Sequence, residues 1–207
     1  MKKILAALMA LVMLFGLCAC SAEQEEEFVP ARGTVENNVY KNEAFGISYT
    51  AEADWYYYTD DEIAATMGTT AEELFTDEYA EAIADAEIIY DMYCANLTTG
   101  ETVNVNYENL GAIYGTVLDE EAYIASAAAQ LENQLAASGL SITKNEAGTA
   151  TVDGKEVPCL YVTMEYSGVS IYEVIVVKKV GDWMGAVTVA SLEEAELENL
   201  VSNVSFE

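Results

Sequence analysis

The stretch that decides the fold is EAGTATVDGKEVPCLYVTMEYSGVSIYEVIVVKKVGDWMGAVTVA, residues 146–190. Its runs of β-branched and aromatic residues are separated by turn-forming pairs: Asp153-Gly154, Ser167-Gly168 and Gly181-Asp182. Such pairs tolerate the positive φ angles that two-residue hairpin turns require. We therefore predict successive antiparallel strands over residues 146–152, 156–166, 170–180 and 183–190.

Two further strands are predicted upstream, over residues 87–97 and 101–107, around a turn at Thr99-Gly100. In the second strand, apolar residues alternate with Thr102, Asn104 and Asn106. Alternate side chains of a strand point to opposite faces. We expect this strand to cover a core with one face and to face water with the other. Short strands are also expected at residues 39–40 and 47–50.

Helices are predicted between these strands by their start signals and apolar spacing. One begins at Asp60, and the longest runs from Asp119 to a stop at Gly139. Two capping boxes predict helices that bury Phe75, Tyr79 and Ile83 in one case, and Leu197, Leu200, Val201 and Val204 in the other; the boxes are Thr70–Glu73 and Ser191–Glu194. The whole pattern predicts one α+β domain over residues 39–207, with a mainly antiparallel sheet flanked by helices.

The charge of the chain excludes several classes of function. The sequence has 8 Lys plus Arg against 36 Asp plus Glu, with a net charge of −28. We expect no nucleic-acid partner, because phosphate binding requires a basic surface. No His is present, so a Ser/His/Asp triad, a Cys/His pair and a His-based zinc site are excluded. We expect no enzyme, no cofactor and no dedicated metal site.

The N-terminus predicts export and lipid anchoring. Lys2 and Lys3 precede an apolar run from Ile4 to Leu17 that is short for a transmembrane helix. The run ends in Leu17-Cys18-Ala19-Cys20, which resembles a bacterial lipobox. Residues 1–19 are therefore predicted to be the lipoprotein signal peptide, and Cys20 to carry the lipid. The expected location is the extracytoplasmic face of the cell membrane, where acyl chains anchor the protein.

The segment that follows, residues 20–38, is predicted to be the lipidated Cys and an acidic tether. Glu23, Glu25, Glu26 and Glu27 form a run of like charges that repel one another. We expect an extended spacer that holds the domain away from the bilayer.

One segment resembles a known superfamily. It is Asn42-Glu43-Ala44-Phe45-Gly46-Ile47-Ser48-Tyr49-Thr50, followed by Trp55 and Asp60-Asp61-Glu62-Ile63. A late hairpin at Gly181-Asp182 and a closing helix before Val204-Ser205-Phe206 agree with it. The layout resembles small lipoproteins of Firmicutes that look like the PsbP/Mog1 superfamily. The resemblance implies an antiparallel sheet flanked by helices, and it carries no catalytic residue.

The densest aromatic run is Trp55-Tyr56-Tyr57-Tyr58, and with Trp183 it forms a candidate ligand patch. Aromatic faces could stack a sugar ring or another planar ligand, while nearby carboxylates accept hydrogen bonds from hydroxyl groups. The alternative is that alternate members of the run point into the core.

Acidic clusters and thiols are the remaining candidates. None of the clusters has the spacing of a dedicated calcium loop; they are Asp60-Asp61-Glu62, Asp77-Glu78 and Asp119-Glu120-Glu121. Cys94 and Cys159 are the thiols outside the signal region. Strand alternation places their sulfur atoms on opposite faces, so we expect free thiols, with a disulfide as the alternative.

These observations favour a membrane-anchored, non-catalytic binding or assembly domain. Its acidic surface would suit a protein partner with a basic surface. The alternative is a carbohydrate- or small-ligand-binding module that uses the patch at Trp55–Tyr58.

The lipobox generates a first prediction. Replacing Cys20 by Ala removes the atom that would carry the lipid, so the variant should leave the membrane fraction and become soluble after cell lysis and centrifugation. Cys18→Ala is the matched control and should stay membrane-bound. Retention of the Cys20→Ala variant in membranes would refute the assignment.

Overall fold

The computed structural model describes residues 28, 31–67, 88–135 and 140–207. These residues form an α+β fold with two antiparallel sheets, which confirms the predicted fold class. The larger sheet has the order β4-β5-β6-β10-β9-β8-β7. Its strands are β4 (Tyr56–Tyr57), β5 (Ile88–Ala95), β6 (Thr102–Asn109), β7 (Ser141–Val152), β8 (Lys155–Tyr166), β9 (Val169–Val180) and β10 (Trp183–Ser191).

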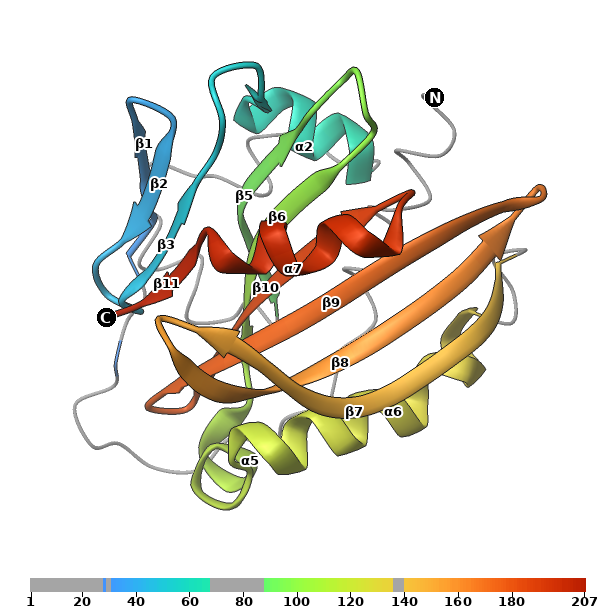
Figure 1. Cartoon of the computed structure of the whole chain (residues 1–207). Helices are drawn as coiled ribbons and strands as arrows, with labels where there is room; N and C mark the ends of the chain where they lie inside the picture. Colours follow the sequence, from blue (N-terminus) through green and yellow to red (C-terminus); the bar gives the residue numbers. More distant parts are fainter. Residues whose placement is uncertain (1–27, 29–30, 68–87, 136–139) are drawn as a thin grey trace.

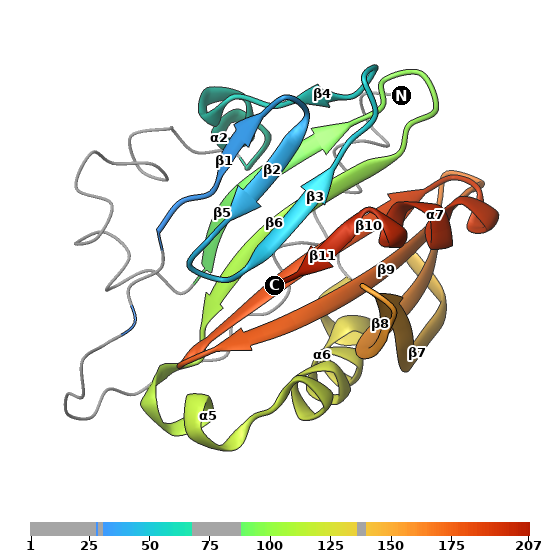
Figure 2. The same cartoon turned by 60° about the vertical axis from the view of Figure 1, so that its left-hand side comes forward.

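The smaller sheet joins segments from both ends of the described chain. It has the order β1-β2-β3-β11, and its strands are β1 (Thr34–Glu36), β2 (Val39–Asn42), β3 (Ile47–Thr50) and β11 (Val204–Phe206). Figure 2 shows this sheet in front of β5 and β6. The helices are α2 (Asp60–Met67), α5 (Gly111–Val117), α6 (Glu120–Leu135) and α7 (Leu197–Ser202), the last preceded by the 3₁₀ turn η2 (Glu194–Glu196).

Residues with positive φ angles form the hairpin turns of the large sheet. Asp153 and Gly154 have φ angles of 51° and 71°, and Ser167 and Gly168 have 53° and 80°. Two positive φ angles in succession match the twist of antiparallel strands. The same device joins β1 to β2 at Asn37 and Asn38. The turn pairs of residues 146–190 therefore act as the sequence predicts.

The large sheet is covered on both faces. One face packs on the small sheet and on α7, and the shared core includes Val105, Val187 and Leu200. The opposite face packs on α6 through Leu160, Ile175 and Leu131, among others. Figure 1 shows α6 and α7 on opposite sides of β7, β8 and β9. Strands between two layers bury both sets of alternating side chains.

This double cover corrects the expectation for β6. Thr102, Asn104 and Asn106 were expected to face water, but they are 1%, 5% and 6% exposed. They lie on the same face as the residues that pack against α6, because their strand partners on β10, Ala190, Thr188 and Ala186, lie on that face too. The polar side of the strand is therefore buried.

The two thiols are free and buried, as expected, but for a different reason. Cys94 and Cys159 both belong to the core between the sheets, so their sulfur atoms are on one face. Cys94 is on β5 and Cys159 on β8, and three strands lie between these two. Four strand spacings amount to about 19 Å, which no disulfide can bridge.

Three other sequence predictions differ from the structure. The box Ser191–Glu194 does not cap the last helix: the Ser191 hydroxyl accepts a hydrogen bond from the backbone N–H of Glu193, and α7 begins only at Leu197. Val204 is buried, but it lies in β11. Helix α5 was not predicted, because its seven residues include two glycines. The helix expected around Phe75, Tyr79 and Ile83 lies outside the described residues.

Part of the predicted tether belongs to the folded domain. Residues 34–36 form β1, which pairs with β2 in antiparallel register. Just before β1, both Nη atoms of Arg32 donate to the carboxylate of Asp60 on α2, at 2.7 and 2.8 Å. The pairing of β1 with β2 could not be predicted from the sequence, because β1 has only three residues and all are exposed.

A buried carboxylate, Asp91, connects this N-terminal arm to both sheets. Its Oδ2 atom accepts hydrogen bonds from the backbone N–H of Gly33 at 2.8 Å, from the Tyr40 hydroxyl at 2.6 Å and from Asn42 Nδ2 at 3.0 Å. Arg32 Nε lies 3.5 Å from the other oxygen. The register of β5 shifts between Tyr90 and Met92, so Asp91 is the extra residue of a β-bulge.

The Asp91 site generates a stability prediction. Asp91→Ala would remove the acceptor shared by the Gly33 N–H, the Tyr40 hydroxyl and Asn42 Nδ2, so the free energy of unfolding should fall by about 3 kcal/mol. Urea unfolding followed by circular dichroism measures the change. Asp61→Ala removes an exposed acid of α2 and should change stability by less than about 0.5 kcal/mol. Similar effects of the two variants would contradict the role given to Asp91.

A second buried acid, Glu173 on β9, predicts a pH dependence. Its side chain is 0% exposed, and burial raises its pKa well above 4.5. The folded chain therefore retains a proton that the unfolded chain loses above that pH, so this group makes stability fall as pH rises. Glu173→Gln removes the effect, so its melting temperature should gain on that of the original protein as the pH rises above 4.5.

Thermal unfolding at a series of pH values tests this expectation. Glu165→Gln, at an exposed position of the neighbouring strand β8, is the matched control and should show no widening difference. A constant offset between Glu173→Gln and the original protein would mean that Glu173 does not retain its proton.

Candidate functional site

Two hollows lie on either side of α7. The first, here called the hairpin hollow, has a volume of about 660 Å³ and lies between α7 and the β7–β8 hairpin. The second, called the loop hollow, has a volume of about 650 Å³ and lies between α7 and the turns that follow β3 and β5. The helix thus separates two neighbouring depressions of one surface.

The sequence of α7 explains why residues of one short helix line both hollows. Leu197, Leu200 and Val201 are buried in the core between the sheets, and they anchor the helix. Glu198 and Ser202 line the hairpin hollow, whereas Asn199 and Asn203 line the loop hollow. The helical period distributes these polar residues to the two sides of the buried stripe.

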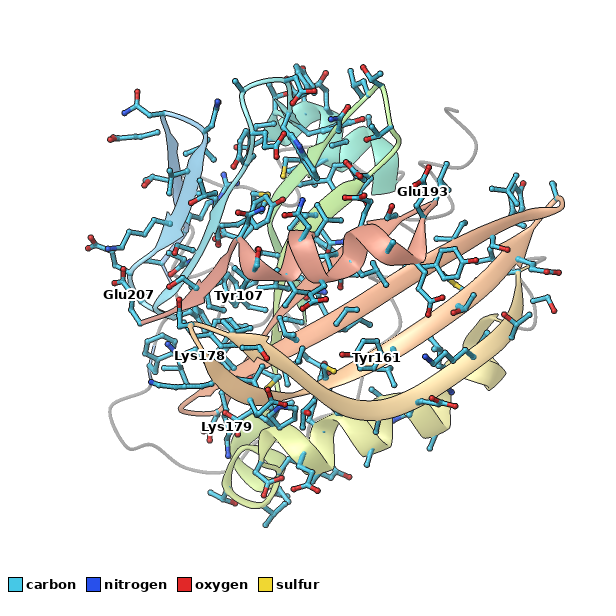
Figure 3. The ribbon with its side chains drawn as sticks, in the orientation of Figure 1. Tyr107, Tyr161, Lys178, Lys179, Glu193 and Glu207 are labelled. Carbon is cyan, nitrogen blue, oxygen red and sulfur yellow. The ribbon has the colours of Figure 1, made fainter. Side chains whose placement is uncertain are left out.

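Carboxylates dominate both linings. Among the described residues, eight acids and one basic residue, Lys144, line the two hollows. The acids are Glu52, Asp54, Glu101, Glu193 and Glu196 in the loop hollow, and Asp153, Glu194 and Glu198 in the hairpin hollow. Figure 3 shows Glu193 at the end of α7 and Tyr161 on the sheet beneath it. A concave surface lined by one sign of charge concentrates the opposite ion. The surface around α7 should therefore attract cationic groups.

Tyr161 forms an ordered aromatic wall of the hairpin hollow. Its hydroxyl donates to the backbone carbonyl of Thr149 at 2.8 Å, and Lys144 Nζ lies 5.3 Å from its ring centroid. The ring crosses Gly148, where a Cβ atom would lie 3.1 Å from a ring carbon. Burial raises the pKa of Tyr161 to about 12, so the phenol stays neutral at physiological pH.

The predicted aromatic patch is not assembled as one surface. Trp55 is 8% exposed, packs at 5.9 Å from Tyr49 and lines the loop hollow. Trp183 is buried at the start of β10, while Ser191, at the other end of the same strand, lines the loop hollow. The two indoles therefore lie at opposite ends of the sheet.

Strand alternation divides the three tyrosines between two faces, and the ring centroids of Tyr56 and Tyr58 lie 5.2 Å apart on the same face. Tyr57 donates to the Asn38 carbonyl at 3.0 Å and packs against the core between the sheets. Tyr58 packs on Tyr93 at 4.7 Å, on the opposite face. Tyr56 is exposed and donates to Glu62. Of the five predicted residues, Trp55 is the one that lines a hollow around α7.

The described residues bear on few of the remaining candidates from the sequence. Cys20 lies outside the described residues, so its lipidation stays a prediction. Among the described residues, no group of His, Cys, Asp or Glu is arranged to hold a metal ion. None of the described helices is long and apolar enough to cross a bilayer.

Sequence reasoning missed the acidic lining of α7. Its carboxylates come from four separate segments, around residues 52–54, 101, 153 and 193–198. In a chain with 36 acids, no spacing marks these positions. Asp91 and Glu173 had a clearer signal, because each is an acid with apolar or aromatic residues on both sides in its strand.

The chain was compared with protein families, curated proteins and solved structures. No protein-family model matches the chain, and no curated protein matches it. The solution structure of CyanoP, the cyanobacterial PsbP from Synechocystis sp. PCC 6803, aligns with a TM-score of 0.49 and 9% identity. That alignment covers 90% of this chain and 98% of CyanoP.

A second solved structure is similar over a smaller part. It is a crystal structure of a protein from Bacteroides thetaiotaomicron VPI-5482, with a TM-score of 0.41 and 10% identity. The alignment covers 79% of this chain and 46% of that chain.

Proposed function

We propose that this protein is a lipid-anchored, extracytoplasmic binding domain without catalytic activity, and that the hollows around α7 take a basic segment of a protein partner. The observation that carries the proposal is the lining of those hollows, which has eight carboxylates and one ammonium group. A basic segment would neutralise this charge and would be steered toward it from a distance.

The form of the hairpin hollow favours Lys and Arg side chains over small inorganic cations. Val174, Leu197 and Val201 provide apolar surface at its base, and Asp153, Glu194 and Glu198 provide acceptors. A long basic side chain lays its methylene stem along apolar surface and keeps its charged end in contact with acceptors. An arginine fork would in addition bind a carboxylate through two hydrogen bonds.

Anchoring through Cys20 is the second component of the proposal. The acidic segment after Cys20 leads to Arg32, whose guanidinium is bound by Asp60 and lies beside Asp91. The tether would therefore join the domain at β1, a strand of the small sheet. A partner would meet α7 at the outer surface of the bilayer.

A carbohydrate or another small ligand is the alternative occupant. Tyr161 offers an aromatic ring in the hairpin hollow, and Thr149, Thr151 and Asp153 lie in the same lining. A ring next to acceptor oxygens is the arrangement that stacks a sugar and binds its hydroxyl groups. This alternative uses Tyr161 rather than the run Trp55–Tyr58 considered from the sequence.

The proposal predicts charge-dependent binding at α7. A fluorescent peptide of Lys and Arg separated by Ser should bind the full-length protein, and a peptide with Glu in place of the basic residues should not. The triple variant Glu193→Gln, Glu196→Gln, Glu198→Gln should bind about tenfold more weakly at low salt. This follows from about 0.5 kcal/mol for each exposed ionic contact. Fluorescence anisotropy measures both affinities.

The matched control is the triple variant Glu36→Gln, Glu43→Gln, Glu165→Gln, which removes the same charge at exposed positions that line neither hollow. It should bind almost as tightly as the original protein. An equal loss in both triple variants would mean that only the overall charge attracts the peptide, and would overturn the assignment to α7.

Cross-linking in cells identifies the partner itself. A recurrent cross-linked protein, recovered in near-equal amount and lost in the α7 triple variant, would establish the binding role. Glycan binding that disappears in Tyr161→Ala, with no protein partner recovered, would establish the alternative.

A further inference from the structure

Half of the exposed large hydrophobic side chains in the described part of the chain belong to one short helix, α5. Ile113, Tyr114 and Val117 are 57%, 41% and 69% exposed. The other three occur singly, on β1, on β4 and in the turn after β5. Apolar residues scattered singly over a surface need no explanation, whereas a cluster of them marks a place of contact with another apolar surface.

Contacts on its other side hold α5 with this apolar face outward. Leu110, just before the helix, is 1% exposed, and Leu118, just after it, packs against the core beneath α6. The backbone N–H of Leu110 donates to the carbonyl of Asp182, in the turn between β9 and β10, at 2.8 Å. A Cβ atom at Gly115 would collide with the Asp182 carboxylate. The helix is therefore fixed on this turn by its buried side.

The N-terminal arm meets the domain at the same turn. The ring of Phe28 packs edge-on against Phe45, with 5.2 Å between the centroids, and its Cβ atom would lie 3.4 Å from a Cβ atom at Gly181. Gly181 directly precedes Asp182, on which α5 packs. Eight residue steps lead from Cys20 to Phe28, and they span at most about 28 Å. A lipid on Cys20 would therefore keep this end of the domain close to the bilayer.

The loop hollow lies at the other end of the large sheet. Strand β10 begins at Trp183, beside the turn that carries α5, and ends at Ser191, which lines the loop hollow. Eight residue steps along a strand amount to about 27 Å. Figure 3 shows Lys179 near α5 and Glu193 at the far end of β10. This separation exceeds the Debye length of about 8 Å, so a bilayer at α5 would not repel the carboxylates of the loop hollow strongly.

The chemistry of α5 suits the interface of a bilayer. No charged residue occurs from Asn109 to Leu118. Aliphatic side chains enter the boundary of the acyl chains, and a tyrosine ring lies at the level of the headgroups. Three side chains are too few for stable binding by themselves, since even a single myristoyl chain gives only marginal binding. A tether makes the contact intramolecular and raises its effective concentration.

We propose that Ile113, Tyr114 and Val117 insert into the bilayer interface as a second attachment point beside the lipid on Cys20. The domain then rests on the membrane through α5, with the loop hollow directed away from it. The inference rests on the lipid anchor of the proposed function, but it does not depend on what binds around α7. The eight steps of chain before Phe28 set how far the domain can leave the bilayer.

A dye at position 117 tests the proposal on the lipidated, full-length protein in phosphatidylcholine vesicles. Cys94 and Cys159 are buried, so an environment-sensitive dye should react with the thiol of Val117→Cys. Nitroxide-labelled lipid should quench this dye, and acrylamide in the water should not. Leu97→Cys is the matched control, because Leu97 is also apolar and 54% exposed but lies in the turn beside the loop hollow. A dye there should be quenched by acrylamide and not by the labelled lipid.

A second variant separates insertion from anchoring. Ile113→Asp with Tyr114→Asp changes two exposed positions, so the fold should persist. In the Val117→Cys background this double variant should stay on the vesicles through its lipid, while its dye becomes accessible to acrylamide. Cys20→Ala should leave the vesicles altogether. The α7 triple variant should behave as the original protein, so failure of binding at α7 does not affect the result.

Each contrary outcome has a distinct meaning. A dye at position 117 that stays in water while the protein is on the vesicles would overturn insertion of α5 and leave the lipid anchor standing. A lipidated protein that does not bind vesicles would overturn both. Protection from acrylamide without vesicles would mean that a second copy or another segment covers α5, and would overturn the proposal. Lipid quenching that persists in the double variant, or that is equal at position 97, would do the same.

Discussion

The two-sheet architecture depends on the carboxylate of Asp91. It is one side chain, yet it accepts hydrogen bonds from the N-terminal arm at Gly33 and from the small sheet at Tyr40 and Asn42, while its own backbone belongs to the large sheet. Tyr40 also hydrogen-bonds Tyr107 of β6 at 2.6 Å, and Phe45 stacks on Tyr107 at 3.8 Å. The polar centre is thus enclosed by aromatic rings. Low polarity strengthens its hydrogen bonds and makes each unpaired group expensive.

Once the small sheet is fixed on β5 and β6, the rest of that face is left to α7. The helix is too short to cover β7, β8 and β9 completely, and the uncovered parts on its two sides are the hollows. On the opposite face, α6 packs on the apolar half of the sheet. The polar half contains Thr102, Asn104, Thr188 and Glu173, which are buried as well. The same sheet therefore has an open acidic surface on one side and an enclosed polar surface on the other.

Much of the fold could be predicted from the sequence, because its signals are local. The turn pairs at Asp153-Gly154 and Ser167-Gly168 impose two hairpins whatever the rest of the chain does. Ile124, Ala127 and Leu131 mark the buried stripe of α6 by their spacing alone. Burial of Asn104 could not be predicted in this way, since an alternating strand looks the same whether its polar side meets water or a second layer.

In the candidate site, too, residue types could be predicted from local signals, whereas their positions relative to one another could not. Trp55 could be selected from the sequence because it begins an aromatic run. Its position beside Glu193 and Glu196 arises only when β10, η2 and the turn after β3 come together. The free thiols were predicted, whereas their true separation depends on strand order, which no local pattern encodes. Long-range placement, rather than residue type, is what sequence reasoning lacked for this chain.

The pairing of β3 with β11 has a consequence for the order of events during synthesis. Val204 pairs with Tyr49, and Phe206 with Ile47, so the small sheet joins segments made at very different times. The hairpins of β7 to β10 join neighbouring segments of the chain, whereas β3 keeps an unpaired edge until β11 has been made. Helix α7 lies between β10 and β11 in the chain, and it is positioned in the same final step. The acidic hollows are therefore absent from every nascent intermediate, and a partner can bind there only after the small sheet has closed.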